Sequence, residues 1–475
     1  MRAHGKLCGA ILVGLLAFGG MASLPAEGQA PSTRAKTATQ AGGAIRHVII
    51  VSVDGLLPAS YTAPDEHGLK VPTLRELAKN GSVSPGARSV MPASTYPAHT
   101  AIATGTNPGT NGIVSNQAWD PLEKNQAGWR WYTEDIRVPT LWQAARAQGL
   151  KTALIYWPVT LGAQATALVP EFWRAGTLED AKLLRAISTP GLLDAVARRI
   201  PDLWKHLTPP DVKDRATTEI AAHLIETLKP HLLMLHIFEV DHWQHEKSPW
   251  SREANAAVEN ADAQLARVIA AAKKAGIWER TALVVVSDHG FARYTQQVRP
   301  GILLREKGLV TLDERNRLTD WKAVMTANTG TAYIYVKDAK DEQTKKAVRE
   351  IFEPLAGKPG TGIGRIFTQK EIAEMGGDPE AFLGLEAAEG FLITWGYTGE
   401  LISAARGPAG HGFAPDREDM KCSILLYGPA IAPGRLEGAR LIDVAPTVAQ
   451  WLGLRMEKAE GRPLAVALRK RGMRQ

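Results

Sequence analysis

The sequence predicts an α/β fold in which helices cover both faces of a largely parallel central sheet. Uninterrupted Val, Ile and Leu runs, typical of strands buried on both faces, alternate with amphipathic segments along the chain. Hydrophobic residues form 45% and charged residues 22% of the 475 residues, which indicates a globular protein with a substantial core. The net charge of +7 is spread along the chain without a dense Lys/Arg block, so nucleic-acid binding is not indicated.

Strands are expected where an apolar run is short and Val/Ile/Leu-rich, and helices where apolar residues recur at helical spacing. The expected strands are 46–55, 151–157, 231–238, 281–288, 332–336, 391–395 and 423–428. The expected helices are 71–80, 138–149, 214–229, 252–276 and 441–453. No repeat of fixed period interrupts this order.

Two regions depart from the alternation. Residues 171–213 are Trp- and Pro-rich and are hard to assign to a sheet. Residues 291–410 carry a second αβ pattern between two motif-bearing segments, and we interpret them as a smaller α+β cap or insertion. The expected organisation is a core of residues 46–290 and 411–455, the cap, and a C-terminal tail of residues 456–475.

The N-terminus predicts export. Arg2 and Lys6 precede an apolar run that has the length of a signal-peptide core and is too short for a stable membrane span. We assign residues 1–26 to a signal peptide, with a retained anchor as the alternative, and residues 27–45 to a flexible linker. The mature chain would keep only Cys422 and could form no internal disulfide. A periplasmic or secreted location follows.

Metal-ligating residue types stand where the predicted strands end. These residues are Asp54, Asp241, His245, Asp288 and His289, and a sixth, His411, lies between glycines just before strand 423–428. The carboxyl ends of strands in an open α/β sheet collect functional groups at one edge. His and carboxylate together suit zinc-like ions, and a pair of such ions assists in-line displacement.

Each of these residues also has a structural interpretation. An Asp after a strand commonly caps a helix or forms a turn, and His411 alone would be a turn residue. His242 competes with His245 on spacing alone. The joint pattern nevertheless favours a metal site.

The stretch MPASTYPAHT, residues 91–100, places two hydroxyls at the start of a helix-like run. Ser94 or Thr95 could simply cap that helix, since Pro97 fits a first helical turn. A hydroxyl could instead be a nucleophile, because a divalent ion lowers its pKa and a helix N-terminus offers N–H groups to phosphate oxygens. The residues alone leave both interpretations open.

The set VSVDG, PASTYPAHTAIATGTNPGTNGI, EVDHWQHEKSP, VVSDHG and GHGF resembles the alkaline phosphatase superfamily, and within it the type I phosphodiesterase / nucleotide pyrophosphatase family. The resemblance spans residues 46–453 and implies an alkaline-phosphatase-like fold. It selects Thr95 as the nucleophile, in the pattern P-x-x-T-[FY]-P. It also implies two divalent metal ions, most commonly Zn²⁺. Their implied ligands are Asp54, Thr95, Asp288 and His289 for one ion, and Asp241, His245 and His411 for the other.

The same resemblance implies that Tyr96 stacks on the substrate and that Trp157, in YWPVT, lines the substrate side. The sequence departs from the family at Ala98, where studied members carry an Asn whose amide contacts a phosphoryl oxygen. Loss of such a hydrogen bond costs about 1.5–3 kcal/mol if nothing replaces it. His99 is a possible substitute, although a structural role is the simpler interpretation.

These observations predict a secreted, two-metal phosphodiesterase or nucleotide pyrophosphatase that acts through a phospho-threonine intermediate on a small-molecule substrate. A phosphomonoesterase or phosphonate hydrolase on the same core is the alternative. A non-catalytic binding protein is disfavoured, because all seven implied positions hold chemically competent residues. The sequence gives no indication of the oligomeric state.

Overall fold

The computed structural model describes residues 45–122, 124, 128–172, 178–207 and 213–469. The expected signal peptide and all but Ile45 of the expected linker lie outside the described residues, as do residues 470–475 of the expected tail. The described residues all belong to one compact unit. Among the described residues, no helix is both long and apolar enough to span a membrane.

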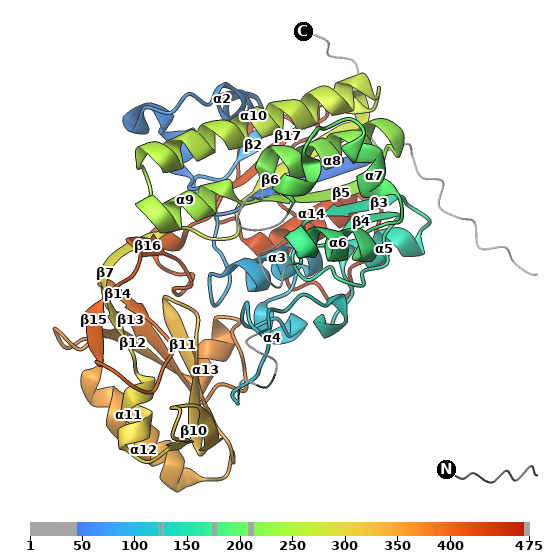
Figure 1. Ribbon diagram of the computed structural model, residues 1–475. Coiled ribbons are helices and arrows are strands. Elements are labelled where there is room, and N and C mark those ends of the chain that lie inside the picture. Colours follow the sequence, from blue (N-terminus) through green and yellow to red (C-terminus); the bar gives the residue numbers. More distant parts are fainter. Residues whose placement is uncertain (1–44, 123, 125–127, 173–177, 208–212, 470–475) are drawn as a thin grey trace, which may run out of the picture. The chain divides into compact units, whose positions relative to one another are not determined.

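The α/β prediction is confirmed by an eight-stranded sheet of order β18-β2-β17-β6-β1-β5-β3-β4 (Figure 1). Its strands are β1 (His47–Val53), β2 (Ser82–Val83), β3 (Thr152–Ile155), β4 (Ala167–Val169), β5 (Leu232–Ile237), β6 (Thr281–Val286), β17 (Ile424–Tyr427) and β18 (Gly434–Arg435). From β6 to β4 the strands are parallel, while β17 runs antiparallel to β6 and β2. The sheet is therefore largely parallel, as expected.

Helices cover both faces of this sheet because its side chains alternate between two apolar cores. Ile49, Val51 and Val53 of β1 belong to one core, and Val48 and Ile50 to the other. The first core receives α2 (Pro72–Asn80), α6 (Leu178–Ile187), α7 (Leu192–Ala197), α8 (Asp214–Thr227) and α10 (Arg252–Lys274). The second receives α3 (Thr95–Thr104), α5 (Leu141–Ala147) and α14 (Val444–Leu452). The other α-helices of this part are α1 (Ala59–Thr62), α4 (Pro108–Asn111) and α9 (Glu239–Lys247).

The expected cap is an α+β region with its own apolar core. One antiparallel sheet has the order β10 (Ala323–Ala327), β11 (Thr331–Val336), β13 (Leu383–Ala387) and β12 (Ile363–Thr368). A second joins β14 (Gly390–Ile393), β7 (Ala292–Val298) and β15 (Ile402–Ala404), and β16 (Ala409–Gly410) also pairs with β7. The hairpin β8 (Val310–Leu312) with β9 (Leu318–Trp321), and helices α11 (Gly301–Glu306), α12 (Glu342–Phe352) and α13 (Gln369–Glu374), complete it. The cap core also contains Met91 and Ala93, which directly precede the expected nucleophile.

Candidate active site

Two neighbouring parallel strands bring the first group of predicted ligands together. The register of β1 and β6 pairs Ser52 with Val286, so Asp54 and Asp288 leave the sheet at the same edge. His289 follows directly. Possible ligand atoms of Asp54, Asp288 and His289, which we call the inner group, lie within 4.8 Å of one another. All three residues are buried, and the backbone N–H of Gly55 donates to Asp288 Oδ1 at 3.1 Å.

The second group comes from a helix and a turn. Helix α9 carries Asp241 and His245 four residues apart, and their Oδ1 and Nε2 atoms are 3.3 Å apart. His411 follows β16, with Nε2 3.7 Å from the same Asp241 oxygen. Gly412 has φ +83°, and a Cβ there would meet the Asn328 carbonyl oxygen at 1.7 Å, so the turn requires glycine. We call Asp241, His245 and His411 the outer group.

The two groups adjoin through their histidines. The rings of His289 and His411 stack with centroids 3.6 Å apart and planes 11° apart. His289 also lies with Asp241 and His411 in a second cluster of possible ligand atoms. His242, which competed with His245 on spacing, is exposed and packs against Trp243. The geometry thus brings all six strand-end and turn residues to one place.

Thr95 is the first residue of α3, and its Oγ1 lies 3.4 Å from His289 Nε2. Ser94 is the N-cap residue, but its hydroxyl makes no capping hydrogen bond. The nucleophile expected from the sequence therefore stands beside the inner group, at the N-terminal end of a helix, where the helix dipole favours an anion.

Buried oxygens in both groups fit a cation. Asp54 Oδ1, Asp288 Oδ2 and Asp241 Oδ1 have no hydrogen-bond partner within the described part of the chain. The nearest groups are ring nitrogens: His289 Nε2 lies 3.2 Å from the Asp54 oxygen and 3.1 Å from the Asp288 oxygen. Buried carboxylate oxygens normally have a partner. Carboxylate oxygens and imidazole nitrogens form the donor set that zinc-like ions prefer.

The inner group retains protons that a cation would replace. Burial raises the pKa of Asp288 to about 8, and the charge of Asp54 adds to the effect. Burial alone would also raise the pKa of Asp54, but the hydrogen bond from His236 and the charge of the neighbouring His289 hold it well below its usual range. Burial lowers the pKa of His289, yet the charges of Asp288 and Asp54 outweigh burial and raise it to about 9.

The sequence profile of the type I phosphodiesterase / nucleotide pyrophosphatase family matches residues 48–374. The chain belongs to this family. Human ectonucleotide pyrophosphatase/phosphodiesterase family member 1 is 24% identical over 230 residues, which cover 46% of this chain and 21% of the human protein. Venom phosphodiesterase 2 of Crotalus adamanteus is 24% identical over 257 residues, which cover 51% of this chain and 26% of the venom protein. The chain therefore matches only about a quarter of the length of these relatives.

A solved structure supports the fold assignment. Human ectonucleotide pyrophosphatase/phosphodiesterase 5 superposes with a TM-score of 0.59 at 18% identity, covering 87% of this chain and 97% of the human chain. The murine protein, solved as an inactive variant in complex with AMP, gives a TM-score of 0.58 at 19% identity. These phosphodiesterases and pyrophosphatases are phosphoric ester hydrolases, and the chain shares their alkaline-phosphatase-like architecture.

Tyr96 and Trp157, which were expected to contact the substrate, lie in the core of the present chain. Tyr96 and Trp157 are both 0% exposed. The Tyr96 hydroxyl donates to Glu171 Oε1 at 2.7 Å, and its ring packs against Trp129 with centroids 5.2 Å apart. Trp157 packs against His99. Neither ring presents a face on which a substrate could stack, so we assign neither a substrate contact.

Asn116 is a candidate site residue that the sequence did not indicate. Its Oδ1 accepts a hydrogen bond from the backbone N–H of Tyr96 at 2.9 Å, which places the amide beside the nucleophile. An Asn in a polar loop gives no signal in the sequence. His99 does not replace it, since its ring is buried and its Nδ1 lies 2.8 Å from the Thr95 carbonyl oxygen.

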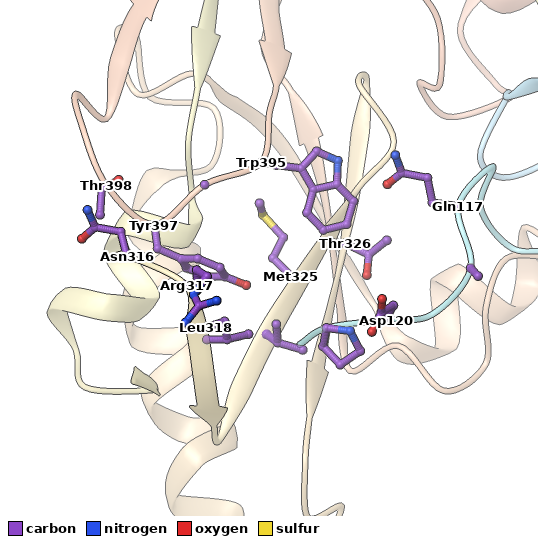
Figure 2. Close-up of a pocket in the computed structure, with 14 residues that line it drawn as sticks. Gln117, Asp120, Asn316, Arg317, Leu318, Met325, Thr326, Trp395, Tyr397 and Thr398 are labelled. Carbon is purple, nitrogen blue, oxygen red and sulfur yellow. The ribbon is translucent and has the colours of Figure 1, made fainter. Parts of the chain in front are cut away.

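A cavity of about 330 Å³ lies between the cap and the segment that follows Asn116 (Figure 2). Trp395, Tyr397 and Met325 line one part of it, and Gln117 and Asp120 another. The cavity contains no member of the inner or outer group. It is therefore separate from the clustered ligands, although Gln117 is the chain neighbour of Asn116.

Proposed function

We propose that the protein is a metal-dependent phosphodiesterase or nucleotide pyrophosphatase that cleaves phosphodiester or phosphoanhydride bonds with Thr95 as the nucleophile. The observation that carries the proposal is the position of the Thr95 hydroxyl, at the N-terminus of α3 and 3.4 Å from His289 Nε2. Family membership supports the reaction class.

Two divalent ions, preferably Zn²⁺, would be held by the residues that the family resemblance implies. Asp54, Thr95, Asp288 and His289 would hold one ion, and Asp241, His245 and His411 the other. When bound, such ions neutralise phosphoryl charge and lower the pKa of a coordinated hydroxyl. The buried carboxylate oxygens without hydrogen bonds support this assignment.

The chain's own residues divide the reaction into two displacements. Thr95 Oγ1 attacks phosphorus, the bond from phosphorus to the leaving oxygen breaks, and the Thr95 proton passes through solvent to the leaving oxygen. The positive end of the α3 dipole stabilises the phosphoryl oxygens. Water then attacks the phospho-threonine, releasing the product acid and restoring the hydroxyl. Two in-line displacements retain configuration at phosphorus.

Asn116 would supply the amide that Ala98 cannot. Its Oδ1 is held by the Tyr96 N–H, and its Nδ2 makes no hydrogen bond to any other described residue. That amide is available to a phosphoryl oxygen, a contact worth about 1.5–3 kcal/mol when the acceptor is charged. Asn116→Ala is expected to lower kcat/KM by about 10- to 100-fold. Gln117→Ala, one residue further, is the matched control and should change it less than twofold.

Paired kinetics on bis-p-nitrophenyl phosphate and p-nitrophenyl phosphate, with Zn²⁺ present, test the proposal. Diester hydrolysis should exceed monoester hydrolysis; the reverse would favour the phosphomonoesterase. Thr95→Ala should lower kcat by about 1,000-fold or more, whereas Ser94→Ala should retain most activity. Full activity in Thr95→Ala would refute the nucleophile assignment. Because a murine structural neighbour was solved in complex with AMP, nucleotide diesters are the natural substrates to test next.

We also propose that the chain is exported. The names "ectonucleotide" and "venom" of its relatives support this, as does the apolar run near residue 10. N-terminal sequencing of the mature protein would test cleavage after residue 26, and an uncleaved N-terminus would contradict it.

A further inference from the structure

A buried chain of hydrogen bonds links the inner group to the residue after the nucleophile. His236 Nε2 lies 3.0 Å from Asp54 Oδ2, and His236 Nδ1 lies 2.8 Å from Glu171 Oε2. The other Glu171 oxygen accepts from the Tyr96 hydroxyl at 2.7 Å. Asp54, His236, Glu171 and Tyr96 are between 0 and 3% exposed, so water does not compete for these contacts.

The sheet holds the members of this chain in register. His236 lies on β5 directly beside Ser52 of β1, two residues before Asp54. Glu171 follows β4, which is joined to β5 through β3. A buried ring with a carboxylate at each nitrogen has an acceptor for an N–H at both positions. The ring therefore bridges the two carboxylates.

These hydrogen bonds fix the orientation of the Asp54 carboxylate. His236 occupies Oδ2, whereas Oδ1 has no hydrogen bond among the described residues and lies 3.2 Å from His289 Nε2. The carboxylate thus presents one oxygen to the inner group and keeps the other engaged. Glu171 uses its second oxygen to hold Tyr96, which is the second residue of α3. The Glu171 side chain thereby contacts both His236, which holds Asp54, and Tyr96, which follows Thr95 at the start of α3.

We propose that His236 and Glu171 are positioning residues that fix Asp54 as a metal ligand and hold the start of α3 against it. The proposal depends on the proposed function only in that Asp54 holds an ion. Partners that orient a metal ligand are worth about 10- to 100-fold in metal affinity or activity. Glu171 acts on the ion through His236, and on Thr95 through Tyr96.

The test measures Zn²⁺ dissociation constants by chelator competition, Co²⁺ visible spectra, and kcat and KM on bis-p-nitrophenyl phosphate. In Glu171→Gln the negative charge beside His236 is lost, and an amide N–H replaces one of the two acceptor oxygens. We expect Zn²⁺ affinity to fall by about 10-fold or more and kcat to fall likewise, with KM within about twofold. Tyr96→Phe breaks only the link from Glu171 to α3 and leaves the His236–Asp54 contact intact, so we expect kcat to fall while Zn²⁺ affinity stays within about twofold. A Co²⁺ spectrum altered in Glu171→Gln but not in Tyr96→Phe supports the proposal.

A double-mutant cycle separates positioning from mere stability. His236→Leu should weaken Zn²⁺ binding by about 10-fold or more, and adding Glu171→Gln should weaken it little further, because the two act in one chain. Additive losses, or Zn²⁺ affinities equal to wild type in folded single variants, would overturn the proposal. Should His236→Leu not fold, the comparison of Glu171→Gln with Tyr96→Phe decides alone. Failure of the wild-type protein to bind Zn²⁺ would overturn the proposed function as well, whereas equal binding by all variants overturns only the positioning role.

Discussion

The inner and outer groups differ in what holds them. The inner group stands on the ends of two hydrogen-bonded parallel strands, and the side chains of Asp54, Asp288 and His289 are at most 5% exposed. In the outer group, helix α9 supplies Asp241 and His245, whose side chains are 19% and 35% exposed. His411 stands on a turn that leads from the cap back to the main sheet.

This difference shows how one site combines a rigid part and an accessible part. Strands fixed in register allow little independent movement, and burial strengthens every charge interaction there. A helix end and a turn have fewer neighbours to hold them. We therefore expect the inner group to bind its ion more tightly and to contribute more to the chemical step, while the outer ion exchanges more readily.

Asp288→Asn is expected to give the largest effect. Loss of an inner carboxylate removes part of the charge that holds the ion, and Lewis-acid stabilisation is worth several kcal/mol, or about 1,000-fold in rate. Asp241→Asn in the outer group should lower kcat/KM by a smaller factor, about 10- to 100-fold. Steady-state kinetics with metal analysis of each purified variant measures the difference. A larger loss in Asp241→Asn would reverse the comparison.

Chelation tests, without a mutation, whether the inner group holds its ion more tightly than the outer group. Titration with EDTA should remove the outer ion first, so the metal-to-protein ratio should fall in two steps. Ions present at 100 times their dissociation constant stabilise the folded state by about 2.7 kcal/mol each, so each step should lower the melting temperature. Thermal denaturation and metal analysis at each EDTA concentration measure both quantities. Loss of both ions in a single step would show that the groups bind as one.

The strand-end pattern predicted much of this site. Asp54 and Asp288 follow strands whose Val/Ile/Leu composition identifies them as buried and parallel, and parallel strands end at one edge. The cap was recognised because its αβ pattern separates two motif-bearing segments. Short elements such as β2 and β18, with two residues each, carry no periodicity that sequence could reveal.

Contacts between distant residues could not be predicted in the same way. Asn116 reaches Tyr96 over 20 positions, and Glu171 reaches His236 over 65. No local pattern encodes such a pairing. Tyr96 was expected to stack on substrate because it follows Thr95, but its hydroxyl finds Glu171 in the core, and an aromatic ring with a satisfied polar end is stable there.

In the metal-free protein, the free energy of unfolding should change with pH because residues of the inner group titrate. Asp288 has a pKa of about 8 when folded against an ordinary value near 3.8, so the native state retains a proton that the unfolded state releases. Stability is therefore lost as pH rises from about 4 to 8, by at most about 1.4 kcal/mol per pH unit. His289, raised to about 9, acts in the same direction from about pH 6.5 to 9.

Chemical denaturation with EDTA at pH 6, 7 and 8 measures this slope. Asp288→Asn removes the carboxyl titration and should flatten the slope relative to wild type, so the stability difference between the two proteins should change steadily with pH. Parallel slopes would show that Asp288 is ionised in the folded metal-free protein. Asp313→Asn in the exposed β8–β9 turn, outside both groups, is a control that should leave the slope over this range unchanged.

The smallest effect on metal binding is expected from a substitution of Asp214, which contacts the start of helix α9. Asp214, at the start of α8, accepts hydrogen bonds from the backbone N–H groups of Phe238 and Glu239, which begin α9. Burial and the charge of Glu239 raise the pKa of Asp214 to about 7, so a neutral side chain is compatible with this position. Asp214→Asn keeps an acceptor oxygen and should leave Zn²⁺ affinity within about twofold.

Asp214→Ala removes both acceptor oxygens and leaves two partly buried N–H groups without this partner, at about 1–3 kcal/mol in unfolding free energy. Because Asp241 lies two residues beyond Glu239 on α9, this variant should shift only the first, outer step of the EDTA titration. The inner step should not move, since β1 and β6 do not depend on α9 for their register. A shift of the inner step in Asp214→Ala would mean that the helix also holds the strand-end ligands in place, and that the two groups form one structural unit.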